Sequence, residues 1–255
     1  MKLQGKTAII TGGGRGLGRS AAIALAEEGA DVAMMSRTAG ELEDVADRIK
    51  AAGGKALAVP GDVSDTGHIS RIVQETMTRF SGIDILVNNA AIIGPASFMK
   101  QAVPEEWRRT LDINLNAAAV FCRFCVPAMR KRGQGKIINI VSGLGRMPFP
   151  RFAAYAASKS GLIQLTRSLA EELKDENIQV NAVDPGVMNT RMQQDIRSLD
   201  ISLMGNELQQ RFSSLYEDNQ LDNPDDIAKT IVFLVSPRAD HINGEIVSGR
   251  KGELQ

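Results

Sequence analysis

Apolar runs of strand length alternate with amphipathic helical stretches along almost the whole chain, and this alternation constrains its fold most strongly. The runs before residue 187 are TAIIT (7–11), DVAMM (31–35), KALAVPGDV (55–63), DILVNNA (84–90), KIINIVS (136–142) and IQVNAVDPG (178–186). They are mostly apolar on both sides, which is typical of parallel strands covered on both faces by helices. The pattern predicts an α/β fold: a doubly wound, mostly parallel, Rossmann-like sheet of about seven strands with helices on both faces.

No linker rich in Pro, Ser or Gly divides the chain, and no internal repeat is present. We therefore expect a single domain over residues 1–255. The stretch 187–222 interrupts the alternation with mixed polar and Met/Leu residues. A long insert of this kind is either a substrate lid or a pair of surface helices.

The composition is that of a globular protein, with 43% hydrophobic residues and a formal net charge of zero. This balance provides no electrostatic reason to expect nucleic acid or an anionic membrane as a partner. No uninterrupted apolar run approaches the ~20 residues of a membrane span. The apolar run of MKLQGKTAII ends at once in TGGG, unlike a signal peptide, so a cytoplasmic protein is expected.

The only two cysteines, Cys122 and Cys125, lie within a long helical pattern from about Glu105 to Arg132. We interpret them as buried, reduced helix cysteines rather than a redox pair. His68 and His241 are isolated, and no second Cys pair exists, so no metal site is expected.

The first strand-like run leads directly into the loop TGGGRGLG (11–18) and then into a helical pattern. Ligands of doubly wound sheets bind beyond the carboxyl ends of the strands, where this loop lies. Glycines let the backbone approach a ligand, and a helix start offers free N–H groups to a pyrophosphate. The spacing through Gly12, Gly16 and Gly18 differs from the usual G-x-G-x-x-G. Its place between strand and helix nevertheless predicts nucleotide binding.

Further motifs follow this loop in a recognisable order. TGGGRGLG, GDV (61–63), NNAA (88–91), INLN, IVSG, YAASK (155–159) and DPGVMNT (184–190) resemble the motifs of the classical short-chain dehydrogenases/reductases. The resemblance covers roughly residues 5–248, and the pattern is similar to 3-oxoacyl-thioester reductases and to general carbonyl or sugar-alcohol reductases. It implies a homotetramer or homodimer, and an enzyme that interconverts a carbonyl and a secondary alcohol of a small-molecule substrate by hydride transfer with a nicotinamide dinucleotide.

Tyr155 and Lys159 are four residues apart in YAASK, so a helix places them on one face, and Ser142 ends a strand at the ligand edge. A phenol has a pKa near ~10, and a nearby ammonium lowers it toward neutrality. We expect Tyr155 to transfer the proton, Lys159 to lower its pKa and Ser142 to orient the carbonyl oxygen. The resemblance adds that Lys159 holds the nicotinamide ribose and that Asn114 supports a water chain re-protonating the site through Lys159.

The same resemblance assigns cofactor contacts to the glycine loop, to the ends of the third and fourth strands and to the segment closing over the nicotinamide. Besides Tyr155 and Lys159, these residues are Gly12, Arg15, Gly16, Leu17, Gly18, Asp62, Val63, Asn89, Ala90, Pro185, Gly186, Met188 and Thr190. Three positions depart from the family pattern. Ala91 replaces a glycine, Asp184 stands where a small residue is common and is expected to face solvent, and the tail lacks the usual acidic-Gly-Gly ending.

The end of the second strand-like run predicts which dinucleotide binds. In NAD-binding chains an acid about ~20 residues past the glycines holds the adenosine ribose. That position is Ser36, followed by Arg37, with Arg15 inside the glycine loop. The missing acid removes a repulsion against a 2′-phosphate, and guanidinium groups grip phosphates well. NADP(H) is therefore expected in preference to NAD(H), with Ser36 and Arg37 as cofactor-binding residues.

The substrate is less constrained than the reaction. The residues expected to line its pocket are Leu144, Arg146, Met147, Phe149, Met188, Met192 and part of 187–222. Many of them are apolar. The family resemblance implies a 3-oxoacyl thioester or similar ketone, and a sugar or polyol is the alternative. An acidic carrier protein would need a basic rim; MRKRGQGK (129–136) supplies bases, but EELKDEN (171–177) opposes them. A non-catalytic dinucleotide sensor remains an alternative, although it predicts an eroded Ser/Tyr/Lys set.

Overall fold

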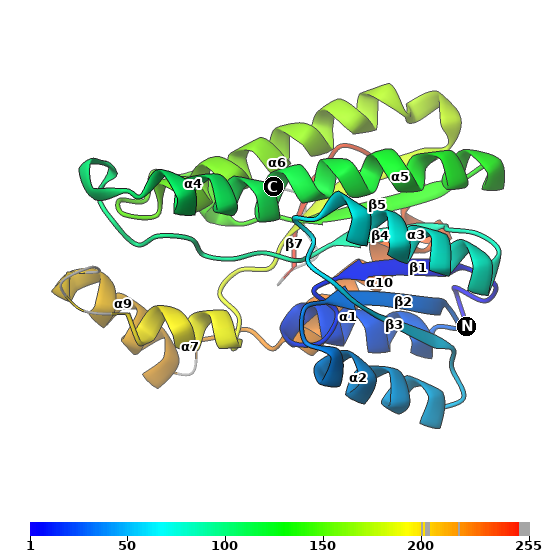
Figure 1. The fold of residues 1–255 in the computed structure, drawn as a ribbon, viewed down its shortest axis with the longest axis horizontal. Coiled ribbons are helices and arrows are strands. Elements are labelled where there is room, and N and C mark those ends of the chain that lie inside the picture. The colour runs from blue at the N-terminus through cyan, green and yellow to red at the C-terminus, as the bar shows by residue number, and fades with distance from the viewer. Residues whose placement is uncertain (200, 202–204, 219, 250–255) are drawn as a thin grey trace.

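The structure is a computed structural model that describes residues 1–199, 201, 205–218 and 220–249. Over this part of the chain it confirms the doubly wound α/β fold (Figure 1). One seven-stranded parallel sheet has the order β3-β2-β1-β4-β5-β6-β7. Its strands are β1 (Thr7–Thr11), β2 (Asp31–Ser36), β3 (Ala56–Pro60), β4 (Ile85–Asn88), β5 (Gly135–Ile140), β6 (Ile178–Asp184) and β7 (Ile246–Ser248). The order reverses between β1 and β4, so ligands are expected beyond these two strand ends.

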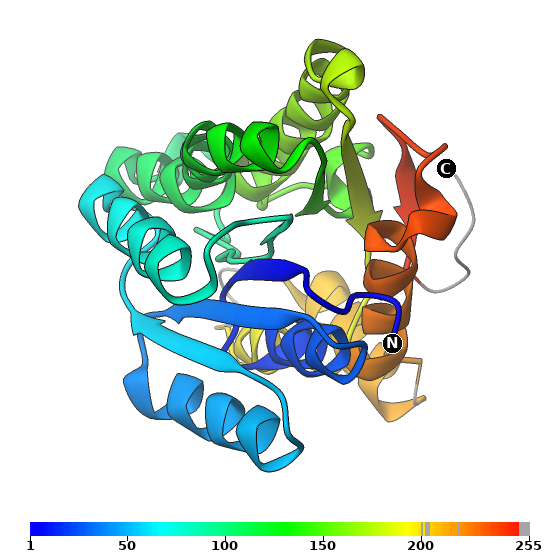
Figure 2. The same cartoon turned by 90° about the vertical axis from the view of Figure 1, so that its right-hand side faces the viewer.

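Helices cover both faces of the sheet, as Figure 2 shows from the side. The helices α1 and α10 pack on each other and, with α2, on one face, while α3 and α5 contribute to the core on the other face. The helices are α1 (Gly16–Glu27), α2 (Ala39–Ala51), α3 (Thr66–Phe80), α4 (Pro104–Leu111), α5 (Ala117–Arg132), α6 (Ala153–Glu172), α7 (Arg191–Arg197), α9 (Asn206–Glu217) and α10 (Pro224–Val235).

Alternate residues of the central strands enter different cores. Ile10 and Met34 belong to the core beside α1 and α10, whereas Ile9 and Met35 belong to the core beside α3 and α5. All four side chains are fully buried. Because successive strand residues point to opposite faces, both sets must be apolar. This two-sided burial explains why the strand sequences show no polar alternation.

The long helical pattern predicted from about Glu105 to Arg132 is divided by a π-helical turn. The turn spans Asp112–Asn116 and joins α4 to α5. Single π-turns inside α-helices frequently occur at functional sites. Asn114, which the sequence analysis singled out, lies in this turn and is buried.

By length and composition alone, the stretch Pro104–Arg132 is apolar enough to cross a membrane. Its mean hydropathy over a long window is higher than its short uninterrupted apolar runs suggest. Half of its most apolar window is buried inside the protein, as in the core helix of a soluble fold. The stretch is therefore weak evidence for a membrane span.

Both cysteines are buried in α5, as expected. Burial raises the pKa of the Cys122 thiol to about 12 and also raises that of Cys125. Thiols held protonated in this way are poor nucleophiles. The interpretation as structural helix cysteines therefore agrees with the structure.

A chain of buried polar side chains holds β4, β5 and α6 together just below the ligand edge. Asn88 Nδ2 donates to Asn139 Oδ1, and Asn139 Nδ2 donates to Thr166 Oγ1, both at 2.9 Å. Asn139 and Thr166 are fully buried. Since buried polar groups are costly without partners, this chain specifies one alignment of the two strands and the helix.

Replacing Asn139 by Ala is expected to lower the free energy of unfolding by roughly 2–4 kcal/mol, because two buried partners lose a hydrogen bond and a cavity forms. Chemical denaturation measures the change. Gln164→Ala is the control, since Gln164 is exposed on α6 and its loss should change the value by less than about 0.5 kcal/mol. Equal stability of the two variants would contradict this role of Asn139.

Candidate active site

The glycine loop forms a backbone cradle at the switch point of the sheet. Gly12 and Gly16 have φ angles of 66° and 53°, a region that side chains disfavour. The N–H groups of Gly12 and Gly13 donate to the Met35 carbonyl oxygen at 2.7 and 3.3 Å, which holds the loop against β2. The first turn of α1 has no side-chain cap. Its free N–H groups fit a pyrophosphate, so the cradle suits a dinucleotide.

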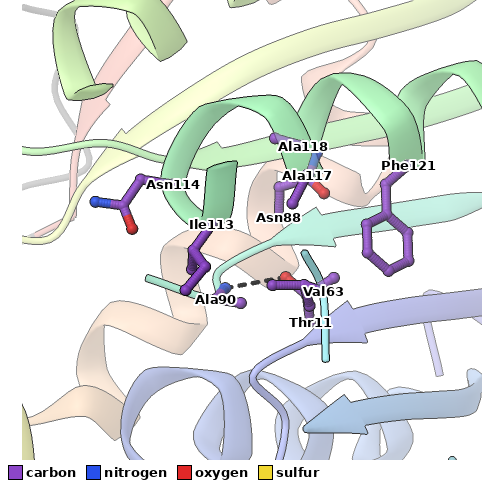
Figure 3. Close-up of a pocket in the computed structure, with 9 residues that line it drawn as sticks. All are labelled: Thr11, Val63, Asn88, Ala90, Ile113, Asn114, Ala117, Ala118 and Phe121. Atoms are coloured by element: carbon purple, nitrogen blue, oxygen red, sulfur yellow. Dashed lines mark hydrogen bonds between the residues drawn. The ribbon is translucent and has the colours of Figure 1, made fainter. Parts of the chain in front are cut away.

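Thr11 fastens the end of β4 to this loop. Its Oγ1 accepts hydrogen bonds from the backbone N–H groups of Asn89 and Ala90, both at 2.9 Å. Figure 3 shows the bond from Ala90. Asn89 Nδ2 donates to the Thr11 carbonyl oxygen at 2.8 Å. The structure thus brings the predicted residues Asn89 and Ala90 to Gly12. Sequence reasoning missed Thr11, although a hydroxyl at the last residue before the loop was a usable signal.

A small cavity lies between the end of β1 and the start of α5 (Figure 3). It is lined by Thr11, Val63, Asn88, Ala90, Ile113, Asn114, Ala117, Ala118 and Phe121. Val63 and Ala90, which the family pattern assigned to the cofactor site, therefore line the same cavity as Asn114. The cavity belongs to the inner wall of the candidate site.

The Asn114 side chain holds the segment after β4 to the π-turn and to α6. Its Oδ1 accepts from the Ile92 N–H, and its Nδ2 donates to the Ile92 carbonyl oxygen, each at 2.9 Å. Nδ2 also donates to Ser158 Oγ at 3.0 Å. These contacts give the side chain a positioning function between β4 and α6.

Ser142, Tyr155 and Lys159 come together at the carboxyl end of β5. The Ser142 hydroxyl lies close enough to the Tyr155 phenol to lower its pKa, and it accepts from the Leu144 N–H at 3.3 Å. Lys159 Nζ lies 5.6 Å from the centre of the Tyr155 ring and donates to the Ile140 carbonyl oxygen at 2.6 Å. Tyr155 and Lys159 are 8% and 2% exposed. The arrangement puts a proton donor beside a hydroxyl that can orient a carbonyl oxygen.

The pKa of Tyr155 is raised, whereas the spacing of Tyr155 and Lys159 led us to expect a lowered pKa. Burial raises it to about 12; the Ser142 hydrogen bond lowers it, and the Asp184 carboxylate raises it further. Burial also lowers the pKa of Lys159 to about 8, opposed by Asp184. Burial is the largest cause of the raised Tyr155 pKa, and it outweighs the lowering that a nearby ammonium would produce.

Asp184 is buried rather than solvent-facing, which corrects the expectation from the sequence. It is 8% exposed, and its Oδ2 accepts from Arg146 Nη2 at 2.8 Å. Its Oδ1 accepts from the Gly186 N–H at 3.2 Å. The ion pair ties the loop after Ser142 to the end of β6. A buried carboxylate requires such partners, and Arg146 is the charged one.

The segment 184–190 reaches the glycine loop. A Cβ built on Gly16 would lie 3.4 Å from Thr190 Cγ2, so these two predicted residues are neighbours. Gly186 has a φ of 70°, and the next residues pair with Asp222, whose N–H donates to the Val187 carbonyl oxygen at 2.8 Å. Met188 packs against the core beside α1 and α10, not beside Tyr155. It lies apart from the apolar cluster around Tyr155.

The adenosine end of the site contains more carboxylates than sequence reasoning identified. Arg15 Nη1 lies 3.6 Å from Glu41 Oε1. Partial burial raises the pKa of Asp62, but hydrogen bonds from Ser64 and the charges of Arg37 and Arg109 outweigh it and leave that pKa below its ordinary value. Arg15 therefore pairs with an acid, and the charge of Arg37 acts electrostatically on another. No sequence motif pointed to Glu41, because its contact with Arg15 joins residues that are distant in sequence.

An apolar wall lies next to Tyr155. Phe149, Phe152 and Phe212 form a triangle with ring centres 5.7 to 6.3 Å apart. Tyr155 belongs to the same cluster, together with Ala96, Ile196 and partly buried Ile93, Leu144, Met192, Leu199, Leu208 and Leu215. Among the expected pocket residues, Leu144, Phe149 and Met192 are thus placed here. Met147 is 57% exposed instead.

The helices α7 and α9 supply part of this wall and project beyond the carboxyl edge of the sheet (Figure 1). They account for most of the described residues of the stretch 187–222. Positions 200, 202–204 and 219 of that predicted lid lie outside the described residues. The helical pattern of 206–217 was a signal that could have identified Phe212.

Comparisons with known proteins agree with this geometry. Residues 6–200 match the family model described as short chain dehydrogenase. The 3-oxoacyl-[acyl-carrier-protein] reductase of Staphylococcus aureus is 34% identical over 243 residues, which cover 95% of each chain. Cyclohexanol dehydrogenase from an Acinetobacter species is 30% identical over 243 residues, covering 95% of this chain and 92% of its own.

A similar solved structure comes from Beutenbergia cavernae. It is named as a candidate NAD(P)-dependent gluconate 5-dehydrogenase and holds NADP at low occupancy. It superposes with a TM-score of 0.86 at 34% identity, covering 97% of this chain and 96% of its own.

Replacing Gly18 by Ala is expected to abolish dinucleotide binding, because the new Cβ would lie 2.2 Å from the Gly12 carbonyl oxygen. The loop must then move away from its cradle geometry. Titration calorimetry with the dinucleotide measures the loss. Gly40→Ala is the matched control, since a Cβ there meets nothing within 4 Å. Unchanged binding by Gly18→Ala would contradict the assignment of the loop.

Proposed function

Because this chain belongs to the short-chain dehydrogenase family, and is therefore an oxidoreductase acting on carbonyl and alcohol groups, we propose that it is an NADP(H)-dependent reductase of an apolar ketone. The observation that carries the proposal is the grouping of Ser142, Tyr155 and buried Lys159 at the carboxyl end of β5. The single-domain organisation, the lid 187–222, the cytoplasmic location and the homo-oligomer stay predictions.

The chemistry follows from the protonation states of the buried groups. A nicotinamide dinucleotide held by the glycine loop would supply or accept the hydride. With a pKa raised to about 12, the Tyr155 phenol is protonated at neutral pH, the form that can donate a proton to a carbonyl oxygen. Ser142 orients that oxygen. Lys159, with a pKa lowered to about 8, can exchange a proton near neutrality and so restore the phenol. Reduction is accordingly the proposed direction.

Two groups at the end of β2 support NADP(H). Ser36 leaves the position without the acid that would repel a 2′-phosphate, and exposed Arg37 follows it. Arg15 stands at the start of α1, also exposed. Guanidinium groups at this place can bind a phosphate, whereas NAD(H) would lack the carboxylate that usually ends β2. NAD(H) is the second cofactor to test.

The aromatic wall beside Tyr155 supports an apolar acyl or ring ketone, and a 3-oxoacyl thioester is our first substrate. A carrier-bound substrate gains no support from the basic stretch 129–136. That stretch lies at the start of β5, at the edge of the sheet opposite the site. Its Arg130 is paired with Glu176, and its Lys136 is paired with Asp240. It therefore does not form a basic rim around the pocket.

The alternative substrate is a sugar, polyol or sugar acid. The similar Beutenbergia cavernae structure, named for gluconate, favours it, as does the partly exposed Arg146 beside the Ser142 loop. Reduced-cofactor oxidation, followed by absorbance, should be compared for 3-oxoacyl-CoA thioesters, cyclic ketones and keto-sugar acids with NADPH and NADH. Turnover of the apolar ketones with NADPH is expected. Cofactor binding without turnover of any carbonyl would overturn the enzymatic proposal.

Tyr155→Phe is expected to reduce kcat by roughly 100- to 10,000-fold, because proton transfer to the substrate oxygen is lost. The ring and its packing remain, so cofactor affinity should stay within about twofold. Steady-state kinetics and calorimetry measure the two quantities. Full activity of the variant would remove Tyr155 from its proposed role.

Asp184→Asn is expected to shift the pH profile. Asp184 raises the pKa of Tyr155, so a neutral replacement lowers that pKa. Arg146 also loses its charged partner, and its uncompensated positive charge lowers the same pKa. Alcohol oxidation needs the deprotonated phenol, so its rise with pH should move to lower pH by roughly 0.5 to 1 unit. Initial rates of oxidation across the alkaline range measure the shift. A move to higher pH would contradict the assignment.

A further inference from the structure

We infer that Glu41 limits the preference for NADP(H) over NAD(H), by placing a carboxylate beside the arginine that would hold a 2′-phosphate. The inference rests on the proposed cofactor preference and deepens it, since it concerns the same end of the site. Glu41 lies in the first turn of α2 and belongs to none of the motifs described above.

The contacts place Glu41 near Ser36, the position at which NAD-binding chains carry a ribose-binding acid. Its Oε1 lies 3.6 Å from Arg15 Nη1. A Cβ built on Gly14 would lie 3.3 Å from Glu41 Oε2 and 3.2 Å from Ser36 Oγ, so both polar atoms border the same glycine. In NAD-binding chains the position of Ser36 carries the acid that holds the ribose. The fold therefore brings a carboxylate from α2 close to that position.

The charges at this end of the site are paired only loosely. The Arg15 and Glu41 side chains are 53% and 33% exposed, and ion pairs with such exposure contribute little to stability. A phosphate can therefore take over the Arg15 guanidinium. Arg37 likewise interacts with a carboxylate, that of Asp62. A phosphate that binds these arginines does not remove Glu41 or Asp62 from the site, because both carboxylates belong to the protein chain.

Glu41 consequently acts on the two cofactors unequally. A 2′-phosphate is doubly negative near neutrality, and a carboxylate a few ångströms away repels it. A 2′-hydroxyl carries no charge and avoids this repulsion. The carboxylate thus weakens binding of the phosphorylated cofactor while leaving the other nearly unaffected, so the discrimination is smaller than Arg15 and Arg37 alone would produce.

Glu41→Gln tests the inference, because it keeps the side-chain shape and removes the charge. Calorimetry should use 2′,5′-ADP and 5′-AMP as probes, with NADPH and NADH followed by fluorescence. The Kd for 2′,5′-ADP and NADPH is expected to fall roughly three- to tenfold. The Kd for 5′-AMP and NADH should change by less than about twofold, and the difference should shrink near ~1 M salt.

The matched control is Glu43→Gln, an exposed residue of the same helix, which should leave all four affinities unchanged. An equal change for phosphorylated and unphosphorylated probes would overturn the inference. So would a loss of 5′-AMP and NADH affinity alone, because Glu41 would then be a ribose ligand. The proposed NADP(H) preference is judged separately on the wild-type protein, whereas the inference depends only on the change caused by Glu41→Gln.

Discussion

Burial of both faces of a parallel sheet is the constraint on which the rest of this structure depends. Parallel strands need helical crossovers, and these helices cover the sheet on both sides. Every strand then ends at the same edge, so loops distant in sequence become neighbours there. The reversal of strand order between β1 and β4 opens that edge, and the glycine loop, Asn89 and the segment 184–190 meet around it.

Buried polar side chains give this edge its definite geometry. Thr11 joins β1 to the end of β4, Asn114 joins β4 to α6, and Asp184 joins the ends of β5 and β6 through Arg146. Each contact satisfies a group that would be costly to leave unpaired away from water. The same low exposure that makes these contacts strong also raises the Tyr155 pKa and lowers that of Lys159. Positioning and proton chemistry thus have one physical source.

The two ends of the site differ in how their charges are held. Around Tyr155 the ionisable groups are buried, and their partners have well-defined geometry. Around Ser36 the arginines are exposed; Arg15 pairs with Glu41, and the charge of Arg37 acts on Asp62. Solvent screens these outer charges, so changes there alter affinity more readily than the fold. The reaction and the choice of cofactor can therefore vary independently within this architecture.

Sequence alone determined the order of strands and helices, the glycine loop and the spacing of Tyr155 and Lys159, because periodicity and turn chemistry act over short stretches. It also placed Ser142 at a strand end. Only the tertiary structure showed that Asp184 is buried with Arg146, that burial reverses the expected direction of the Tyr155 pKa, and that Glu41 reaches Arg15. Each of these depends on contacts between residues distant in sequence and on the water they exclude, which local sequence patterns do not encode.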